Sequence, residues 1–497
     1  MKNKYQEYKD TLCKVADIEF SIALLAWDQE VNMPSKGSIF RSQQMATLSG
    51  ISHEISTDNQ FGDLLKELNE QKEQLDEKQK KNILLSLEDF EKKSKYTKEF
   101  VIRRSQVTSA AYNAWVKAKS ENNFDVYQEA LQAMFDLKKE ESEILGYKAN
   151  PYDAHLDQFE KGATVAELDV LFKDVKEQLV DFVKDLMSKS QIEDNFLYKF
   201  YQKDKQWSYG LEVLKNMGYD FDSGRQDISH HPFTTNFSPQ DVRVTTRIDE
   251  HNFGSMTWSC IHEGGHALYE QGLPSDEYGL PLGSYVSLGM HESQSRLWEN
   301  NVGRSLPYWK AHYAQLQKIF PENLANVSLE KFYKGINRIQ PNLIRTESDE
   351  LHYHFHVMIR YEIEKGIFEG VIKIKDLREV WNEMYRKYLD IEVPNDNQGV
   401  LQDIHWSHGL IGYFPTYSLG SFYAAQFFHQ AQQDIPNLVS QIENGDNLQL
   451  LKWLREKIHQ HGKFYTASEL CQKITGEPLN FKYFMDYASK KYGEIYE

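Results

Sequence analysis

The segment SCIHEGGHALYEQG (259–272) places two adjacent glycines between two histidines in what otherwise favours an α-helix. A glycine inside a helix costs about 1 kcal/mol relative to alanine, so a pair of them needs a reason in packing or in function. We expect Gly264 and Gly265 to leave the helix bare where another chain element or a substrate passes over it. The chain must therefore fold so that something lies directly against this helix.

The rest of the chain predicts a mainly helical protein. Proline is scarce, with 13 in 497 residues, and stretches rich in Glu, Lys, Leu and Gln recur. The apolar residues of 165–187 follow the three-and-four spacing of an amphipathic helix, and FSIALLAW (20–27) predicts a buried helix segment. One stretch, VRVTTRI (242–248), has the β-branched composition of a strand. It lies directly before the glycine-containing helix.

Charge and cysteine content restrict the partners and the compartment. A formal net charge of −17 argues against nucleic acid or an anionic membrane surface as a partner, because phosphate contacts need a basic surface. Cys13, Cys260 and Cys471 lie far apart, as is typical of a reducing compartment. The sequence shows neither a secretory signal nor a run of about 20 apolar residues. We therefore expect a cytoplasmic protein with peptide or small-molecule partners.

The histidines flanking the glycines have the spacing of metal ligands. Positions four apart lie on the same face of a helix, so His262 and His266 can direct two imidazoles at one ion, with Glu263 at the edge of that face. This is the HExxH pattern, in which neutral imidazoles hold zinc and the glutamate acts on zinc-bound water. The alternative, two ordinary histidines on an amphipathic helix, leaves the glycines unexplained.

A catalytic zinc needs a third protein ligand, and the next predicted helix offers three candidates. In MHESQSRLWENN (290–301) we prefer Glu292, because the distance from His266 lets the first helix end and a second pack beside it. Glu299 is the second choice and His291 the third. We expect the side chains that are not ligands to orient the zinc histidines through their other ring nitrogens.

A second histidine pair, His352 and His356, has the same spacing in LHYHFHVMIRYEIE (351–364). Glu350 and Glu362 lie near it, but no HExxH glutamate accompanies it. Alternating aromatic and histidine residues fit a packed helix that lines a cleft, so we do not expect a separate metal there.

Six short motifs occur along the chain in a fixed order. They are HPF (231–233), DVRVT (241–245), HEGGH (262–266), HESQ (291–294), IRTESD (344–349) and GVLQDIHW (399–406). In these motifs the chain resembles the thermostable metallocarboxypeptidases of the carboxypeptidase Taq type. The segments LLAWDQEVNMPSKGSIFRSQQ and GYFPTYSLG are similar to that family too, so the resemblance covers most of the chain.

The resemblance implies a fold of the mainly α class. This fold is a large helical body with a deep active-site cleft, akin to neurolysin and angiotensin-converting enzyme, with a small β-sheet beside the metal helix. It implies a single catalytic unit over 1–497, in which about 1–200 forms an N-terminal helical part flanking the cleft. The motifs lie in a catalytic core at about 220–420.

The resemblance also implies a metal and an assembly state. One zinc ion per chain is expected on His262, His266 and Glu292, with catalysis by Glu263, and the chain is expected to form a homodimer. Cobalt or manganese can occupy a site of this donor set as well.

Peptide hydrolysis through a tetrahedral oxyanion needs hydrogen-bond donors besides the metal. His405 and Tyr413 are our candidates, with Tyr417 next, because a histidine followed eight residues later by a tyrosine is similar to the donor pair of related helical peptidases. With 29 tyrosines in the chain, a packing role is the alternative for each tyrosine.

A carboxypeptidase must recognise a free α-carboxylate, which suits the planar fork of arginine. Arg345 and Arg243 lie in family motifs, and we expect at least one to contact the substrate. The alternative is an ion pair inside each motif, with Asp349 or Asp241 respectively. His231 precedes a proline and is biased to an extended conformation, which directs its ring toward the substrate backbone.

These features predict a cytoplasmic zinc carboxypeptidase that releases single amino acids, with broad specificity, from peptides with a free C-terminus. The alternative within enzymes is a zinc oligopeptidase that cuts short peptides internally and needs no carboxylate anchor. A helical scaffold with structural zinc is the third reading, but it requires a closed four-ligand site, usually rich in cysteine.

Overall fold

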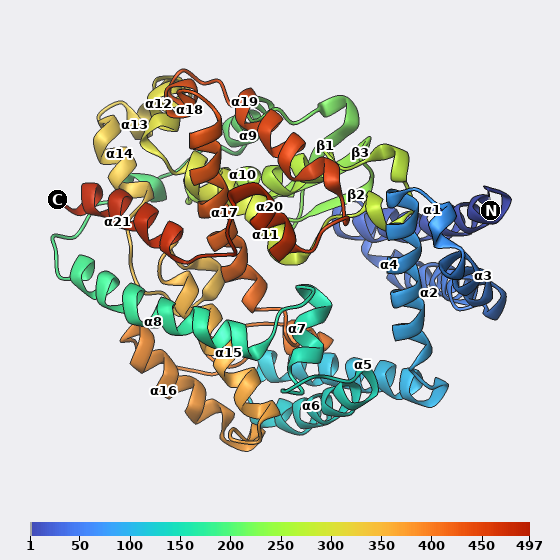
Figure 1. Cartoon of the computed structure of the whole chain (residues 1–497). Coiled ribbons are helices and arrows are strands. Elements are labelled where there is room, and N and C mark those ends of the chain that lie inside the picture. The colour runs from blue at the N-terminus through green and yellow to red at the C-terminus, as the bar shows by residue number, and fades with distance from the viewer. Residues whose placement is uncertain (1) are drawn as a thin grey trace.

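A computed structural model describes residues 2–497 of the chain, and it is predominantly helical (Figure 1). The N-terminal helices are α1 (Lys2–Val31), α2 (Ser38–Ser56), α3 (Asn59–Glu70), α4 (Glu77–Ser94), α5 (Lys98–Glu121), α6 (Asp125–Leu145), α7 (Asp153–Phe159) and α8 (Val165–Met187). Helices α1–α4 gather on one side of the body, and α5 packs along α6. The amphipathic helix predicted over 165–187 is confirmed as α8.

A small sheet lies next to the glycine-containing helix. Its strands are β1 (Gly224–Ile228), β2 (Thr234–Ser238) and β3 (Asp241–Thr246), in the order β1-β3-β2. Strand β3 pairs in parallel with β1 and antiparallel with β2, so β2 is an edge strand. The strand predicted from VRVTTRI is confirmed as β3.

Two helices carry the HEGGH and HESQ motifs, and a third packs against the first of them. They are α9 (Lys203–Met217), α10 (Phe253–Glu270) and α11 (Leu288–Arg296), which continues as a π-helix over Leu297–Gly303. Helix α10 begins where the Asn252 side chain accepts a hydrogen bond from Gly254 N–H, and α11 begins where Ser287 caps Met290 N–H. Helix α10 packs against β2, β3, α9 and α11. The prediction of a mainly α fold with a small sheet beside this helix is confirmed.

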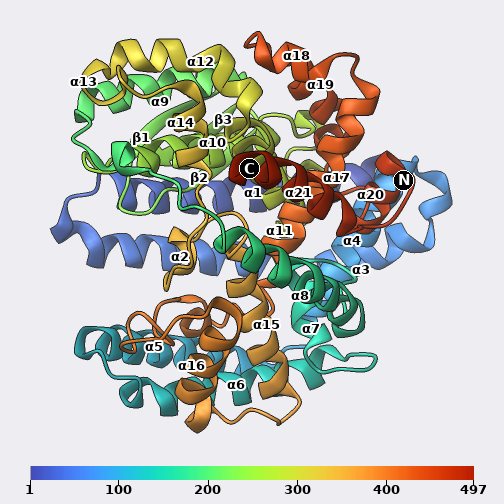
Figure 2. The same ribbon diagram turned by 90° about the vertical axis from the view of Figure 1, so that its left-hand side faces the viewer.

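The remaining helices complete the body around these segments (Figure 2). They are α12 (Leu306–Ile319), α13 (Pro321–Leu324), α14 (Leu329–Ile336), α15 (Tyr353–Phe368), α16 (Leu377–Leu389), α17 (Pro415–Asp434), α18 (Leu438–Glu443), α19 (Leu448–Lys457), α20 (Ala467–Thr475) and α21 (Lys482–Tyr496). Buried apolar side chains from α5 through α21 form one continuous core. Tyr8, Phe61 and Leu65 belong to a separate, smaller cluster among α1, α3 and α4. The single catalytic unit with its two parts stays a prediction.

The segment FSIALLAW differs from its prediction. It is helical, as expected, because it lies within α1. Of its residues only Trp27 is buried, however, and the side chain of Leu24 is 41% exposed. The segment is apolar nearly all round, but α1 makes its main contacts with α2, α3 and β2, so much of its surface stays uncovered. Among residues 2–497, no helix is long and apolar enough to span a membrane.

Candidate active site

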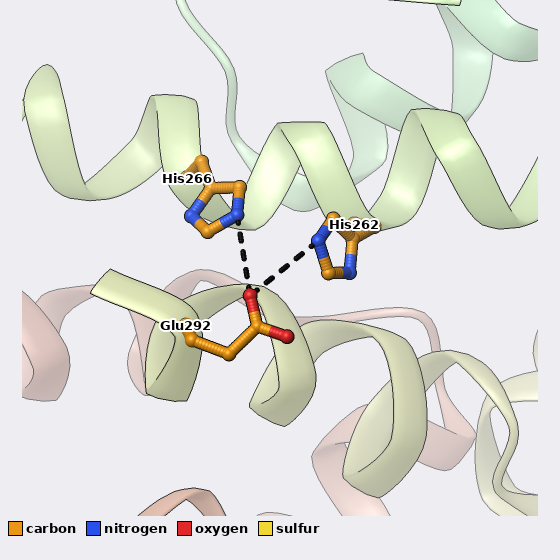
Figure 3. A group of neighbouring side chains, drawn as sticks. All are labelled: His262, His266 and Glu292. Carbon is orange, nitrogen blue, oxygen red and sulfur yellow. Dashed lines mark ion pairs between the residues drawn. The ribbon is translucent and has the colours of Figure 1, made fainter. Parts of the chain in front are cut away.

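Two histidines and a glutamate from adjacent helices converge on one point (Figure 3). The Oε2 atom of Glu292, on α11, lies 3.7 Å from His262 Nε2 and 3.6 Å from His266 Nε2, both on α10. Nitrogen and oxygen ligands about 2.0–2.1 Å from a tetrahedral zinc ion lie about 3.4 Å from one another. The three side chains therefore fit a divalent metal of this kind, and they are the three that the sequence predicted.

The competing histidine pair is engaged elsewhere. His352 Nδ1 lies 2.7 Å from Asp349 Oδ2, and His356 Nδ1 lies 3.0 Å from the hydroxyl of Tyr385. Within residues 2–497, the one group of His, Cys, Asp and Glu whose three ligand atoms lie within 4.8 Å of one another is His262, His266 and Glu292.

The paired glycines allow neighbouring helices to approach α10. A Cβ atom at position 265 would lie 2.6 Å from Ser295 Cα of α11, and one at position 264 would lie 2.7 Å from Leu214 Cδ2 of α9. Both distances are shorter than van der Waals contact. Of the two reasons expected for the glycines, the structure shows the chain element: α11 lies against Gly265, and it is the helix that carries Glu292.

The second ring nitrogen of each histidine has its own partner. His262 Nδ1 lies 2.9 Å from Glu299 Oε2, and His266 Nδ1 lies 2.5 Å from His291 Nδ1. Glu299 and His291, which are not in the triad, thus contact the two histidines on the side away from Glu292. With both Nδ1 atoms engaged, the Nε2 lone pairs are left for a metal.

Arg296 neutralises part of the negative charge at this site. Its guanidinium donates from Nε to Glu292 Oε1 at 2.7 Å and from Nη1 to Glu299 Oε2 at 3.2 Å. Burial disfavours the ionised form of Glu299, but Arg296 and the hydrogen bond with His262 lower its pKa well below the usual range. Glu299 therefore stays a carboxylate behind His262.

Glu263 lies beside the triad and is held by the sheet. Its side chain is buried, and the hydroxyl of Thr234 on β2 lies 2.8 Å from Glu263 Oε2. Burial raises the pKa of Glu263. A carboxylate whose pKa is raised toward neutrality is better able to take up a proton and return it.

The predicted oxyanion donors lie together near the triad. His405 Nε2 lies 3.2 Å from the hydroxyl of Tyr417, and the ring centroids of His405 and Tyr413 are 5.3 Å apart. Burial raises the pKa of Tyr413 to about 12, and the nearby Glu292 carboxylate contributes to the rise. Burial lowers the pKa of His405 to about 3. At neutral pH the tyrosine therefore keeps its proton and the histidine is uncharged.

Helix α17 brings Tyr417 to this place by close packing on α11. A Cβ atom at Gly420 would lie 2.5 Å from Glu292 Cβ, so α17 touches the helix turn that carries the glutamate. Tyr417 lies about one turn before Gly420 on α17.

Arg345 is buried and paired, but not with the aspartate of its own motif. Its Nε and Nη2 donate to Asp403 Oδ1 at 3.1 and 3.0 Å, and Nη1 donates to the Tyr353 hydroxyl at 2.9 Å. Asp403 Oδ2 accepts a second guanidinium, from Arg360 Nε at 2.7 Å. The alternative pairing with Asp349 is wrong, because Asp349 contacts His352 instead.

Arg243 forms the ion pair within its own motif. Its guanidinium donates to both carboxylate oxygens of Asp241 at 2.9 Å and lies 4.4 Å from the ring centroid of Trp27 on α1. Arg243 is opposite Thr235 in the register, and successive strand residues point to opposite faces. Its side chain is therefore on the face of the sheet away from Thr234 and α10, so the structure does not bring it to the triad.

The HPF motif leads into β2. The ring of His231 is exposed, and its backbone carbonyl accepts a hydrogen bond from Ser229 Oγ at 2.6 Å. Phe233 N–H donates to Thr245 Oγ1 at 2.9 Å. The HPF and DVRVT motifs are thus joined by a hydrogen bond that fixes where β2 begins.

Sequence reasoning missed five residues of this neighbourhood. They are Thr234, Asn236, Glu270, Arg296 and Asp403. The alternation of a strand could have placed Thr234 and Asn236 on one face, and the i, i+4 spacing could have joined Arg296 to Glu292. Nothing local connects Asp403 with Arg345, which is 58 residues away.

Comparison with known proteins agrees with the geometry. Residues 7–492 match the family model of the carboxypeptidase Taq (M32) metallopeptidases. Carboxypeptidase 1 of Bacillus subtilis is 38% identical over 99% of this chain and 98% of its own, and thermostable carboxypeptidase 1 of Thermus thermophilus is 37% identical over 95% of both. The crystal structure of an M32 carboxypeptidase from Deinococcus radiodurans superimposes with a TM-score of 0.97 at 35% identity and covers 99% of each chain.

Proposed function

The chain belongs to the carboxypeptidase Taq (M32) family and is a metal-dependent carboxypeptidase, and on this premise we propose that it uses zinc to release single amino acids from peptide C-termini. The observation that carries the proposal is the triad of His262, His266 and Glu292, in which both Nδ1 atoms are engaged and the Nε2 atoms face one carboxylate oxygen. Bound there, a divalent metal supplies a Lewis acid for the peptide carbonyl and lowers the pKa of water.

Glu263 is the proposed general base and acid. Its buried carboxylate takes the proton of the attacking water and then gives it to the departing amine. Tyr413 donates a hydrogen bond to the oxyanion, with His405 and Tyr417 beside it. The support for these roles is that the tyrosines keep their protons and His405 stays neutral at the pH of the reaction.

Arg345 is the proposed anchor for the C-terminal carboxylate. Asp403 carries one negative charge against two buried guanidinium groups, Arg345 and Arg360. A guanidinium has five N–H groups, and Arg345 uses three of them within residues 2–497. The uncompensated charge and the remaining donors suit an incoming carboxylate. Arg243 was the other candidate, and its pairing with Asp241 supports a role in joining α1 to the sheet instead.

The remaining parts of the proposal concern substrate, assembly and compartment. We propose that His231 faces the peptide backbone, that specificity for the released residue is broad, that cobalt or manganese can replace zinc, and that the chain forms a homodimer. Free Cys13, Cys260 and Cys471 support a cytoplasmic location.

The test uses one unstructured peptide in free-acid and C-terminally amidated forms, followed by mass spectrometry with zinc-loaded protein. We expect a ladder of single-residue losses from the acid only, abolished by a chelator. The Glu263→Gln variant, with its metal content measured, should bind zinc and lose about 10²–10⁴-fold in activity. Internal cuts in both peptides would overturn the carboxylate anchor and favour an oligopeptidase.

A further inference from the structure

We propose that one face of strand β2 is a positioning element of the active site: Thr234 orients the general base Glu263, and Asn236 orients the metal-binding imidazole of His266 through Glu270 and His291. This inference rests on the proposed roles of Glu263 and His266. It adds residues that neither touch the substrate nor bind the metal.

The strand presents these two side chains together because of its pleat. Residues two apart in a strand point to the same face, so Thr234 and Asn236 both face α10, whereas Thr235 faces the other way. The start of β2 is fixed by reciprocal contacts: Phe233 N–H donates to Thr245 Oγ1, and Thr245 N–H donates to Phe233 C=O, both at 2.9 Å. The position of β2 against β3 is therefore set before Thr234 is reached.

Two chains of hydrogen bonds, or arms, start from this face of β2, and the first arm ends at the general base. Thr234 Oγ1 lies 2.8 Å from Glu263 Oε2 and 2.9 Å from the backbone carbonyl of the same residue. A hydroxyl has one hydrogen to donate and lone pairs to accept, so it can contact the carboxyl group before and after that group takes up a proton. The side chain of Glu263 is only 8% exposed, so few water contacts compete with this hydrogen bond.

The second arm ends at a metal ligand. Asn236 Nδ2 donates to Glu270 Oε2 at 2.6 Å, and Glu270 Oε1 lies 2.8 Å from His291 Nε2. His291 Nδ1 in turn lies 2.5 Å from His266 Nδ1. Glu270 is buried, and the other three side chains are partly buried.

The directions of these hydrogen bonds follow from the donors available. The carboxylate of Glu270 can only accept hydrogen bonds. It accepts one from the amide N–H of Asn236, and at its other oxygen His291 must therefore donate from Nε2. In the neutral imidazole of His291, Nδ1 is then the acceptor, and His266 donates to it from Nδ1. This tautomer leaves the lone pair of His266 Nε2 for the metal.

The two arms reach different functions from neighbouring positions of one strand. His262, by contrast, is backed directly by Glu299 and does not depend on β2. A strand that serves only for packing would make Thr234 and Asn236 equivalent. The proposal instead assigns one residue to the base and the other to the metal.

The experiment compares Thr234→Val, Thr234→Ser and Asn236→Leu, with Thr235→Val as the matched control on the opposite face. Zinc affinity of each apo-protein is measured by competition with a chromophoric chelator, and kcat and KM are measured with saturating zinc. We expect Thr234→Val to lower kcat about 10–100-fold with KM and zinc affinity unchanged, and Thr234→Ser to restore kcat.

Asn236→Leu should weaken zinc affinity about 10–100-fold and leave kcat at saturating zinc within about threefold of the wild type. The control should change neither quantity. The proposal is overturned if Thr234→Val lowers kcat and zinc affinity together, if serine fails to restore kcat, or if Asn236→Leu binds zinc as the wild type does. Zinc titration needs no substrate, and wild-type hydrolysis of the acid peptide tests the proposed function separately.

Discussion

At the scale of single residues, Asp403 links the buried charges beside the candidate active site. This buried carboxylate bridges Arg345 and Arg360, which lie 58 and 43 residues before it in the chain. Burial disfavours its charge, but the two guanidinium groups hold the pKa of Asp403 well below its usual range. Asp403 therefore stabilises the folded state only while it is ionised.

We expect Asp403→Asn to lower the free energy of unfolding by about 3–5 kcal/mol, because it leaves two buried guanidinium groups without a counter-charge. The measurement is urea unfolding at pH 7. Glu392→Gln is the control, since the pair of Glu392 with Arg386 is exposed, and it should change stability little or not at all. Equal effects of the two variants would contradict the assignment.

The difference in stability between the wild type and Asp403→Asn should depend on pH with a sign that follows from the lowered pKa of Asp403. A carboxyl group whose pKa is depressed in the folded state adds stability above its unfolded pKa, near 3.8, and loses it as the pH falls toward the folded value. The wild-type advantage over Asp403→Asn should thus be constant from pH 7 to 5. Below about pH 3.8 it should shrink by about 1.4 kcal/mol per pH unit.

At the scale of elements, glycines set the distances among three helices. Gly265 lets α11 lie against α10, and Gly420 lets α17 lie against the turn of α11 that carries Glu292. The candidate metal triad spans α10 and α11, so its geometry depends on this spacing. Helix propensity alone would disfavour a glycine at either position.

We expect Gly265→Ala to lower stability by about 1–3 kcal/mol and to weaken zinc binding, because its Cβ would meet the backbone of α11 at 2.6–2.7 Å. Gly50→Ala, in the interior of α2, is the matched control. A Cβ atom there has nothing within 4 Å, so alanine should raise stability by up to about 1 kcal/mol. Thermal melts and zinc titrations of both variants decide the matter, and a neutral Gly265→Ala would refute the packing explanation.

At the scale of the whole molecule, the triad joins elements of the main core. Helices α10, α11 and α17 all contribute to the continuous core that runs from α5 to α21. A metal that binds the folded state and not the unfolded chain stabilises this core by mass action. The smaller cluster among α1, α3 and α4 lies outside it.

We therefore expect a chelator to lower the melting temperature of zinc-loaded protein. At a free zinc concentration 1,000 times Kd, the loss in unfolding free energy is about 4 kcal/mol. Calorimetry of holo- and apo-protein measures it. Glu292→Gln, which weakens the site, should show a smaller shift, and an unchanged shift in that variant would place the stabilising metal elsewhere.

The sequence by itself determined what depends on spacing within one element. The four-residue separation of His262 and His266 placed both imidazoles on one helix face, and the apolar period within 165–187 predicted the amphipathic helix observed as α8. The β-branched composition of VRVTTRI likewise predicted the strand observed as β3. These features are local, because the helix and strand periods alone fix which residues share a face.

Only the tertiary structure decided which groups meet across elements. Glu292 and Glu299 are seven residues apart and both face α10, so spacing could rank them but could not assign one to the Nε2 atoms and the other to Nδ1. Arg345 pairs with Asp403 rather than with Asp349, which is nearer in sequence. Such pairings depend on how helices pack and how a strand is registered, and no period within a single element encodes them.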